Sequence, residues 1–272
     1  MSDLIHPSPP VSGVPEDSRA SRRIKPRPGG LSERLAPHLR RLPSLAVSWI
    51  VAQPCIALLI AFMVTLGFFI TEVLLSSETI SNADDWFPEW LAAHRTAFLN
   101  DASYYVSRIA DAPILIPLVG VVCLYLVLRR RWRTGSFVLQ ASMAEFTSYA
   151  VCVYFISRLR PEVVRLDTFN IHHSYPSGHV AAATAIYGGI ALLLAAHYKA
   201  LPLRIAIWTV AASIPLTVAL ARMYRGEHHP LDVAAGMLMG VGAIVVAVFA
   251  VRTARAVAEL RAEKNSEEVF AG

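Results

Sequence analysis

The sequence predicts an all-α integral membrane protein built as a bundle of six transmembrane helices. Two observations of composition and one of patterning predict this class. The 272 residues are 55% hydrophobic and only 17% charged, and the mean hydropathy is +0.47. A soluble domain carries about 25% charged residues. The apolar residues gather in stretches close to the roughly 20 residues that a helix needs to cross the hydrocarbon core, with short charged segments between them.

The six predicted spans are residues 52–75, 109–128, 135–157, 179–198, 203–221 and 232–251. The second has the weakest pattern, because Pro113 and Pro117 lie near its start. We expect one membrane domain over 45–252, between a basic tail at 1–44 and a second tail at 253–272. The first tail is rich in proline and charge and has little apolar surface, so we expect it to be disordered.

The distribution of basic residues predicts the orientation. If the tail at 1–44 is cytoplasmic, 18 of the 25 lysines and arginines lie on cytoplasmic segments and seven on outer ones. Cytoplasmic loops carry an excess of such residues. We therefore expect a multi-pass protein of the plasma (inner) membrane with both termini in the cytoplasm. The membrane also explains the basic charge without nucleic acid as a partner, because the charges do not follow one soluble face.

The segment between the first two spans carries aromatic residues among acids. We expect residues 86–100 to form a helix in the membrane interface, with Trp86 and Trp90 at headgroup level. A packed connector without that role is an equal alternative.

Three clusters of polar residues lie at the predicted outer ends of the spans. The first is Arg158-Leu-Arg160-Pro161, where the third span ends. The second is Tyr175-Pro176-Ser177-Gly178-His179, where the fourth span begins. The third runs from Arg222 to Asp232, between the fifth and sixth spans. By the predicted topology all three lie on one side of the bilayer, so we expect them to meet in one pocket.

Four of these residues are suited to binding phosphate. Arg160 and Arg222 carry planar forks of donors that match phosphate oxygens bidentately. Ser177 and Gly178 stand at a helix start, where unsatisfied backbone N–H groups favour an anion. Glycine also lets the backbone approach closely. Taken singly, an arginine that reaches a headgroup or a helix cap explains each of them, but the combination indicates a shared phosphate site.

The remaining residues are suited to acid–base and nucleophilic chemistry. His228 and Asp232 are four apart at a helix start, so their side chains share a face. A carboxylate bonded to one ring nitrogen leaves the other as a nucleophile. His179 is then available as general acid for the departing alcohol. We expect neither a metal nor a cofactor. The three cysteines lie in apolar runs without the spacing of a zinc site or disulfide framework.

The segment from Arg160 to Asp232 resembles the signature of the type 2 phosphatidic acid phosphatase superfamily. This family also includes vanadium haloperoxidases and bacterial acid phosphatases. Its signature reads Lys-x6-Arg-Pro, then Pro-Ser-Gly-His, then Ser-Arg-x5-His-x3-Asp. The chain matches the end of the first part at Arg160-Pro161 and the whole second part. It matches the third part at Arg222, His228 and Asp232.

The resemblance implies a phosphohydrolase that removes phosphate from a lipid phosphate or a polyprenyl diphosphate at the outer face of the membrane. By this resemblance His228 attacks phosphorus to form a phosphohistidine, and Asp232 orients it. His179 protonates the leaving group, and water then releases phosphate. The residues that hold the phosphate oxygens would be Arg160, Ser177, Gly178 and Arg222. The membrane lipid is the expected partner.

Two positions depart from the signature. Ala221 replaces the serine before the third-cluster arginine, and we expect little consequence. Val153 stands where the signature has its lysine, so one phosphate-binding cation is missing. We expect Arg158 to supply part of that charge. The gap keeps two alternatives open: a phosphotransferase that passes the phosphoryl group to a lipid or sugar hydroxyl, and a catalytically weakened lipid-binding homologue.

Overall fold

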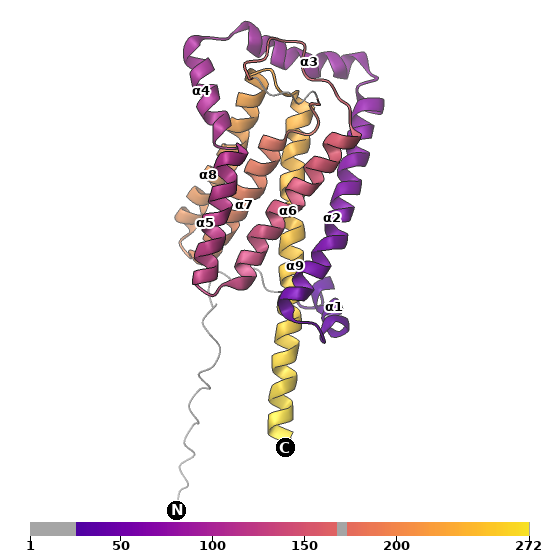
Figure 1. The fold of residues 1–272 in the computed structure, drawn as a ribbon, viewed down its shortest axis with the longest axis vertical. Helices are drawn as coiled ribbons and strands as arrows, with labels where there is room; N and C mark the ends of the chain where they lie inside the picture. The colour runs from indigo at the N-terminus through magenta and orange to yellow at the C-terminus, as the bar shows by residue number, and fades with distance from the viewer. Residues whose placement is uncertain (1–25, 168–172, 272) are drawn as a thin grey trace, which may run out of the picture.

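The computed structural model describes residues 26–167 and 173–271. Within these residues the chain is helical without β-strands, as the sequence predicts (Figure 1). The helices are α1 (Leu31–Leu39), α2 (Ser44–Phe68) with its π-helical continuation η2 (Phe69–Leu74), α3 (Glu78–Ala93), α4 (Ala97–Arg108), α5 (Ala112–Leu128), α6 (Trp132–Phe155), α7 (Gly178–His197), α8 (Leu201–Tyr224) and α9 (Pro230–Ala271).

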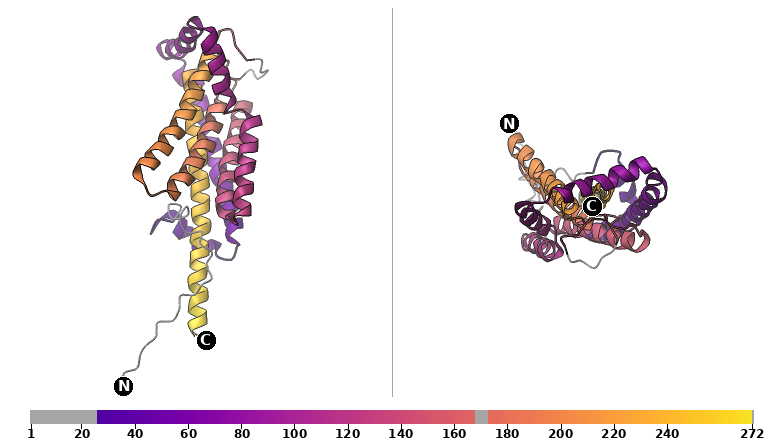
Figure 2. Two further views of the ribbon diagram at one scale, coloured as in Figure 1. Left: turned by 90° about the vertical axis from the view of Figure 1, so that its left-hand side faces the viewer. Right: turned by 90° about the horizontal axis from the view of Figure 1, so that it is seen from above.

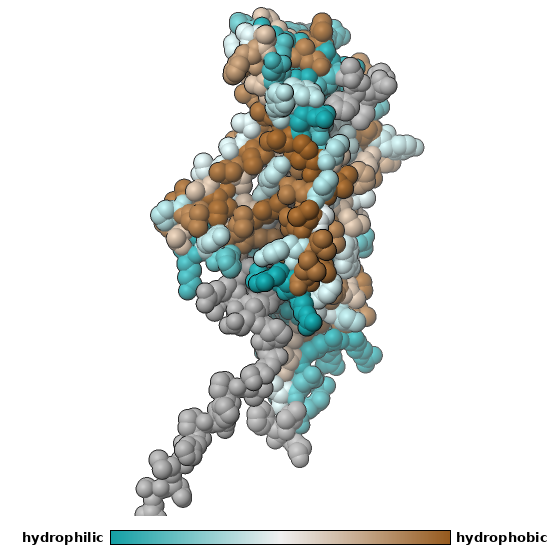
Figure 3. Space-filling model, turned by 60° about the vertical axis from the view of Figure 1, so that its left-hand side comes forward, coloured by the Kyte–Doolittle hydropathy of each residue, from teal (hydrophilic) through white to brown (hydrophobic). Residues whose placement is uncertain are grey.

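Five helical segments of the described residues are long and apolar enough to cross a membrane. They are Ser44–Leu74, Ala97–Leu128, Gly178–His197, Leu201–Tyr224 and Pro230–Glu268. They contain most of the first predicted span and all or nearly all of the second, fourth, fifth and sixth. Figure 3 shows hydrophobic side chains gathered along the middle of one face, with more hydrophilic residues toward its ends. The predicted class, a helical membrane bundle, is confirmed.

Helix α6 coincides with the third predicted span but is more polar than the other five segments. It packs against α2, α5, α7 and α9. Its polar residues include Gln140 and Glu145, which are both buried. The Gln140 side-chain nitrogen donates to the hydroxyls of Ser48 and Ser136, each at 2.8 Å. A helix that faces protein on several sides tolerates such groups, because neighbouring helices satisfy them.

Part of the first predicted tail is helical in the structure. Residues 1–25 of the first tail lie outside the described residues, but Leu31–Leu39 form α1 instead of a disordered segment. The reason is tertiary packing: Ser32 and Ala36 are buried, and α1 lies against α9. At the other end, α9 continues to Ala271, and Figures 1 and 2 show it projecting beyond the bundle.

Helices α3 and α4 form the connection predicted as one interfacial helix over 86–100. The structure has two helices there instead of one. Helix α3 ends at Ala93, and the Thr96 side chain caps α4 by accepting a hydrogen bond from the Leu99 amide at 3.2 Å. Helix α3 lies across one end of the bundle, which we call the capped end (Figure 1). Trp86 and Trp90 are exposed there, as the interfacial interpretation requires.

Two glycines of α9 allow it to lie directly against α7. A Cβ atom at Gly236 would come within 2.5 Å of the Ser177 carbonyl oxygen. One at Gly240 would come within 2.5 Å of the Thr184 Cβ. Small residues four apart let membrane helices approach closely. This contact holds the start of α7, and hence the second cluster, beside the start of α9.

The close contact generates a prediction about stability. Gly240→Leu should force α7 and α9 apart and destabilise the bundle by about 1–3 kcal/mol, the usual range for overpacking. The loss should appear as a lower Tm in detergent. Gly120→Leu is the matched control, because a Cβ at Gly120 has no atom within 4 Å. If both variants melted at the same temperature, the α7–α9 contact would not have the assigned role.

Candidate active site

The structure brings the three predicted clusters together at the capped end. The Ser177 amide, at the start of α7, donates to the Asp232 carbonyl oxygen in α9 at 3.0 Å. The Ser174 amide donates to the Arg158 carbonyl oxygen at 2.8 Å. These backbone hydrogen bonds join the second cluster to the third and to the first. The segment between α6 and α7 is therefore fixed at both of its ends.

His228 is buried, and its ring is oriented by a backbone carbonyl. Nδ1 lies 2.8 Å from the Ser174 carbonyl oxygen, and 4.0 Å from the nearer Asp232 oxygen. A carbonyl oxygen only accepts, so Nδ1 carries the proton and Nε2 keeps its lone pair in the neutral ring. Burial, followed by the charge of Arg222, lowers the pKa of His228 well below its usual value. The ring is therefore held neutral, with Nε2 as its nucleophilic atom.

Asp232 forms hydrogen bonds with the residues around His228 and not with the His228 ring itself. It is fully buried. One carboxylate oxygen accepts from Arg158 Nη1 at 2.5 Å. The other accepts from the Ser174 hydroxyl and from the His229 amide at 2.9 Å. The sequence predicts a direct bond to His228, whereas the structure has Asp232 hold the serine whose carbonyl orients that ring.

Arg158 lies among carboxylates. Besides Asp232, its guanidinium contacts Asp84, a buried residue of α3. The other Asp84 oxygen accepts from the Leu231 amide at 3.0 Å in the first turn of α9. The positive charge that the sequence assigns to phosphate binding thus lies against two buried acids. Arg158 and Asp84 thus connect α3 to the chain that leaves α6 and to the first turn of α9.

Arg160 and Arg222, the two arginines predicted to bind phosphate, converge on one carboxylate. Arg160 Nη1 lies 2.5 Å from Glu227 Oε2 and donates to the Glu227 carbonyl oxygen at 2.6 Å. Arg222 Nη2 lies 3.5 Å from the same Oε2. Glu227 is fully buried. An anion with oxygens in this place would meet donors of both guanidinium groups.

A second acid bridges Arg222 to the neighbouring Arg225. Asp167 accepts from Arg222 Nη1 at 2.7 Å and from Arg225 Nη2 at 2.5 Å. Burial opposes ionisation of Asp167, but the hydrogen bond from Arg225 and the charge of Arg222 outweigh it and lower the pKa. The α6–α7 segment is thereby anchored to the end of α8.

The first turn of α7 has the features of an anion site. Ser177 is fully buried, and its hydroxyl has no hydrogen-bond partner among the described residues. A Cβ at Gly178 would come within 2.7 Å of the Tyr149 ring, so only glycine fits between α6 and α7 here. The amide groups of a first helical turn lack partners within the helix and attract negative charge.

His179, the predicted general acid, follows in the same turn. Its Nε2 lies 2.7 Å from an oxygen of Asp111, which precedes α5. The structure thus brings the three clusters that carry the predicted site residues to the same end of the bundle, and the guanidinium of Arg158 contacts acids there.

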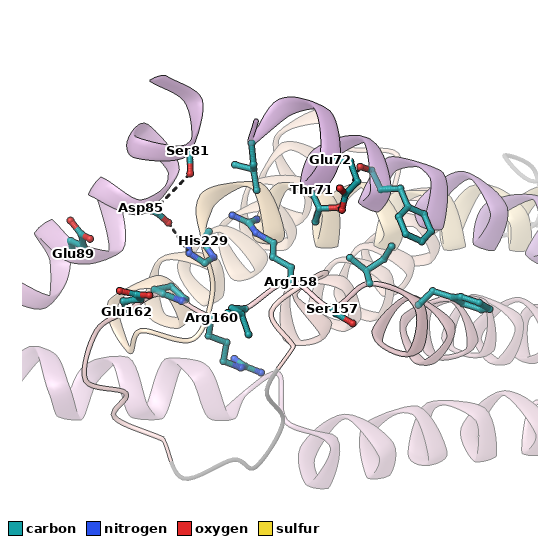
Figure 4. A pocket seen from close by; sticks show the side chains of 16 residues that line it. Thr71, Glu72, Ser81, Asp85, Glu89, Ser157, Arg158, Arg160, Glu162 and His229 are labelled. Carbon is teal, nitrogen blue, oxygen red and sulfur yellow. Dashed lines mark hydrogen bonds and ion pairs between the residues drawn. The ribbon is translucent and has the colours of Figure 1, made fainter. Parts of the chain in front are cut away.

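A cavity of about 580 Å³ is lined in part by Arg160 and lies between η2, α3 and the chain that leaves α6 (Figure 4). Phe68 and Phe155 form part of an apolar side. Polar residues form the rest, and Asp85 Oδ1 lies 3.1 Å from His229 Nε2. A space with an apolar and a polar side, next to an arginine that the sequence predicts to bind phosphate, suits an amphiphile.

Sequence reasoning missed four residues of the site: Asp84, Asp111, Ser174 and Glu227. Glu227 directly precedes His228, so a search for acids beside the motif would find it. Asp111 stands before Ala-Pro at a helix start, a pattern that predicts a cap. Asp84 and Ser174 carry no local signal, because only the fold brings them to Arg158 and Asp232.

The model of the PAP2 superfamily matches residues 137–256. Phosphatidylglycerophosphatase B of Bacillus subtilis is 24% identical over 177 residues, which cover 65% of this chain and 87% of that protein. Decaprenylphosphoryl-5-phosphoribose phosphatase of Mycobacterium tuberculosis is 33% identical over 144 residues, 50% of this chain and 70% of that protein. The crystal structure of a transmembrane PAP2-type phosphatidylglycerolphosphate phosphatase from Bacillus subtilis matches with a TM-score of 0.60 at 23% identity. That match covers 71% of this chain and 93% of that one, and it indicates a shared fold.

The contacts of Arg158 generate a prediction. Arg158→Met should leave Asp84 and Asp232 buried without their cation, which typically costs about 3–5 kcal/mol. Thermal unfolding in detergent should show a large fall in Tm. Lys264→Met is the control, because both side chains of its ion pair with Glu268 are solvent-exposed and such pairs contribute about 0–1 kcal/mol. Equal effects of the two substitutions would contradict the assigned role of Arg158.

Proposed function

Since the chain belongs to the PAP2 superfamily, we propose that it is a membrane phosphatase acting on a lipid phosphate or polyprenyl diphosphate without a metal. The observation that supports this most is that Arg160 and Arg222 converge on the Glu227 carboxylate, directly beside His228 in the chain. The names of the two relatives specify a phosphorylated glycerolipid and a phosphorylated polyprenyl lipid. The amphiphilic cavity beside Arg160 is consistent with such substrates.

In the proposed reaction, His228 Nε2 attacks the phosphorus atom while Arg160, Arg222 and the α7 amides hold the oxygens. The P–O bond to the lipid breaks, and its electron pair stays on the departing oxygen, which takes a proton from His179. A phosphohistidine remains on His228. Water then attacks this intermediate, giving its proton to the now neutral His179, and phosphate leaves. Both imidazoles return to their starting states.

The proposed site faces the outside of the plasma membrane. The capped end of the bundle lies opposite the α5–α6 and α7–α8 turns (Figure 1). Those turns carry Arg129–Arg133 and Lys199. Positive residues mark the cytoplasmic ends of membrane helices. We therefore place both termini in the cytoplasm and the site on the extracytoplasmic side, where a lipid keeps its chain in the bilayer while its phosphate reaches the arginines.

The nucleophile is tested by phosphate release. The purified protein should release inorganic phosphate from at least one member of a panel of lipid phosphates and polyprenyl diphosphates, with chelator present. His228→Ala should reduce turnover by about 10³-fold or more, because the covalent step is lost. His94→Ala is the matched control, an exposed histidine on the same side of the membrane.

The outcomes separate the alternatives. Phosphate release that needs an added lipid or sugar acceptor would identify a phosphotransferase. Lipid binding without turnover in the wild-type protein would identify a weakened homologue, in line with the valine at 153. Wild-type activity that survives His228→Ala would refute the assigned nucleophile.

The pKa of His228 predicts the acid side of the pH profile. Attack needs the neutral ring, and burial together with Arg222 keeps that pKa well below the usual 6.5. Protonation therefore removes the nucleophile only at a lower pH, so the acid limb of kcat should lie below pH 6.5. A kcat profile at saturating substrate checks this. An acid limb at or above pH 6.5 would mean that the ring is not held neutral.

A further inference from the structure

We propose, on the basis of the function above, that Asp111 is the positioning residue of the general acid. It lies outside all three clusters, and it holds His179 in the orientation and charge state that protonate the leaving group. The direct observation is the 2.7 Å contact between Asp111 Oδ1 and His179 Nε2. The second Asp111 oxygen lies 3.3 Å from Arg108 Nη1. The carboxylate is buried, and each of its two oxygens contacts one of these side chains.

The local sequence explains why Asp111 turns away from its own helix. It occupies the N-cap of α5 in an extended conformation, where an aspartate side chain usually accepts from the second or third amide of the helix. Here the second residue is Pro113, which has no N–H. The third amide, of Ile114, donates to the Asp111 carbonyl oxygen at 2.9 Å. The side chain makes no capping bond and contacts His179 instead.

The surroundings of His179 make a carboxylate necessary. The general acid must carry a proton before the lipid leaves, so it must exist as imidazolium. A carboxylate that is hydrogen-bonded to an imidazole ring favours its charged form. Asp111 is the acid that contacts the His179 ring, at 2.7 Å.

The geometry also assigns the proton. With Nε2–H bonded to Asp111, the proton that moves to the departing oxygen comes from Nδ1. The P–O electron pair stays on that oxygen, and the ring becomes neutral while Nε2 keeps its hydrogen. Asp111 remains ionised throughout.

The dependence on the leaving group tests the role. Two substrates are compared in the same detergent: an alkyl lipid phosphate, and an alkylated nitrophenyl phosphate whose phenolate leaves without a proton. Asp111→Asn should lower kcat on the alkyl substrate by about 10²-fold, within the usual range for general acid catalysis. On the nitrophenyl substrate it should lower kcat by less than about threefold. Asp101→Asn, on the exposed side of α4, is the control and should change neither rate.

The pH profile gives a second readout that a purely structural role would not move. Without the carboxylate, the imidazolium of His179 loses its proton at a lower pH. The basic limb of the Asp111→Asn profile on the alkyl substrate should therefore shift to lower pH. Asp111→Glu keeps a carboxylate. Even if its kcat is reduced, it should therefore keep the basic limb of the wild-type pH profile and the wild-type ratio of kcat on the alkyl substrate to kcat on the nitrophenyl substrate. It also serves as the readout if the asparagine variant folds poorly.

The outcomes distinguish this inference from the function on which it rests. A wild-type protein inactive on both substrates would overturn the proposed function. With an active wild type, an equal loss on both substrates with an unmoved basic limb would show that Asp111 only supports the fold. A changed rate ratio in Asp111→Glu would also overturn the positioning role.

Discussion

The capped end of the bundle depends on the neutralisation of buried guanidinium groups. A buried charge is stable only when it is paired and hydrogen-bonded, because its desolvation costs several kcal/mol. The arginines meet carboxylates in every case: Arg158 meets Asp84 and Asp232, Arg160 meets Glu227, and Arg222 and Arg225 meet Asp167. The acids come from α3, from the α6–α7 segment and from the third cluster. These ion pairs therefore fix the positions of both α3 and the α6–α7 segment on the bundle.

This pairing needs helices that approach one another closely, which the glycines provide. Gly236 and Gly240 bring α9 against α7, and Gly178 lets α7 lie against the Tyr149 ring of α6. Without these contacts the Ser177 amide would not reach the Asp232 carbonyl oxygen. The close helix packing and the polar network at the capped end thus depend on each other. The helix packing sets the distances at which the hydrogen bonds and ion pairs of the network can form.

The sequence alone predicts the class, the six helices and the convergence of the three clusters, because hydropathy and charge bias are local signals. It does not predict α1, since only contact with α9 stabilises that helix. It also assigns Arg158 to phosphate, because an arginine near a helix end resembles the missing signature lysine. Its two acidic partners lie 74 residues away along the chain in opposite directions. Such pairings arise from the fold, and no local pattern encodes them.

Glu227 pairs with both Arg160 and Arg222, which has a consequence for the proposed substrate binding. The chain has valine at 153 instead of the signature lysine, so under the proposed function Arg160 and Arg222 would hold the phosphate without that cation. Their shared carboxylate lies where both guanidinium groups already point. Burial raises the pKa of Glu227 above its usual value, although the charges of Arg222 and Arg160 oppose this shift. Under the proposed function, the substrate phosphate displaces the Glu227 carboxylate from the two guanidinium groups. The displacement is favourable because a phosphate has a higher charge and more oxygens than a carboxylate.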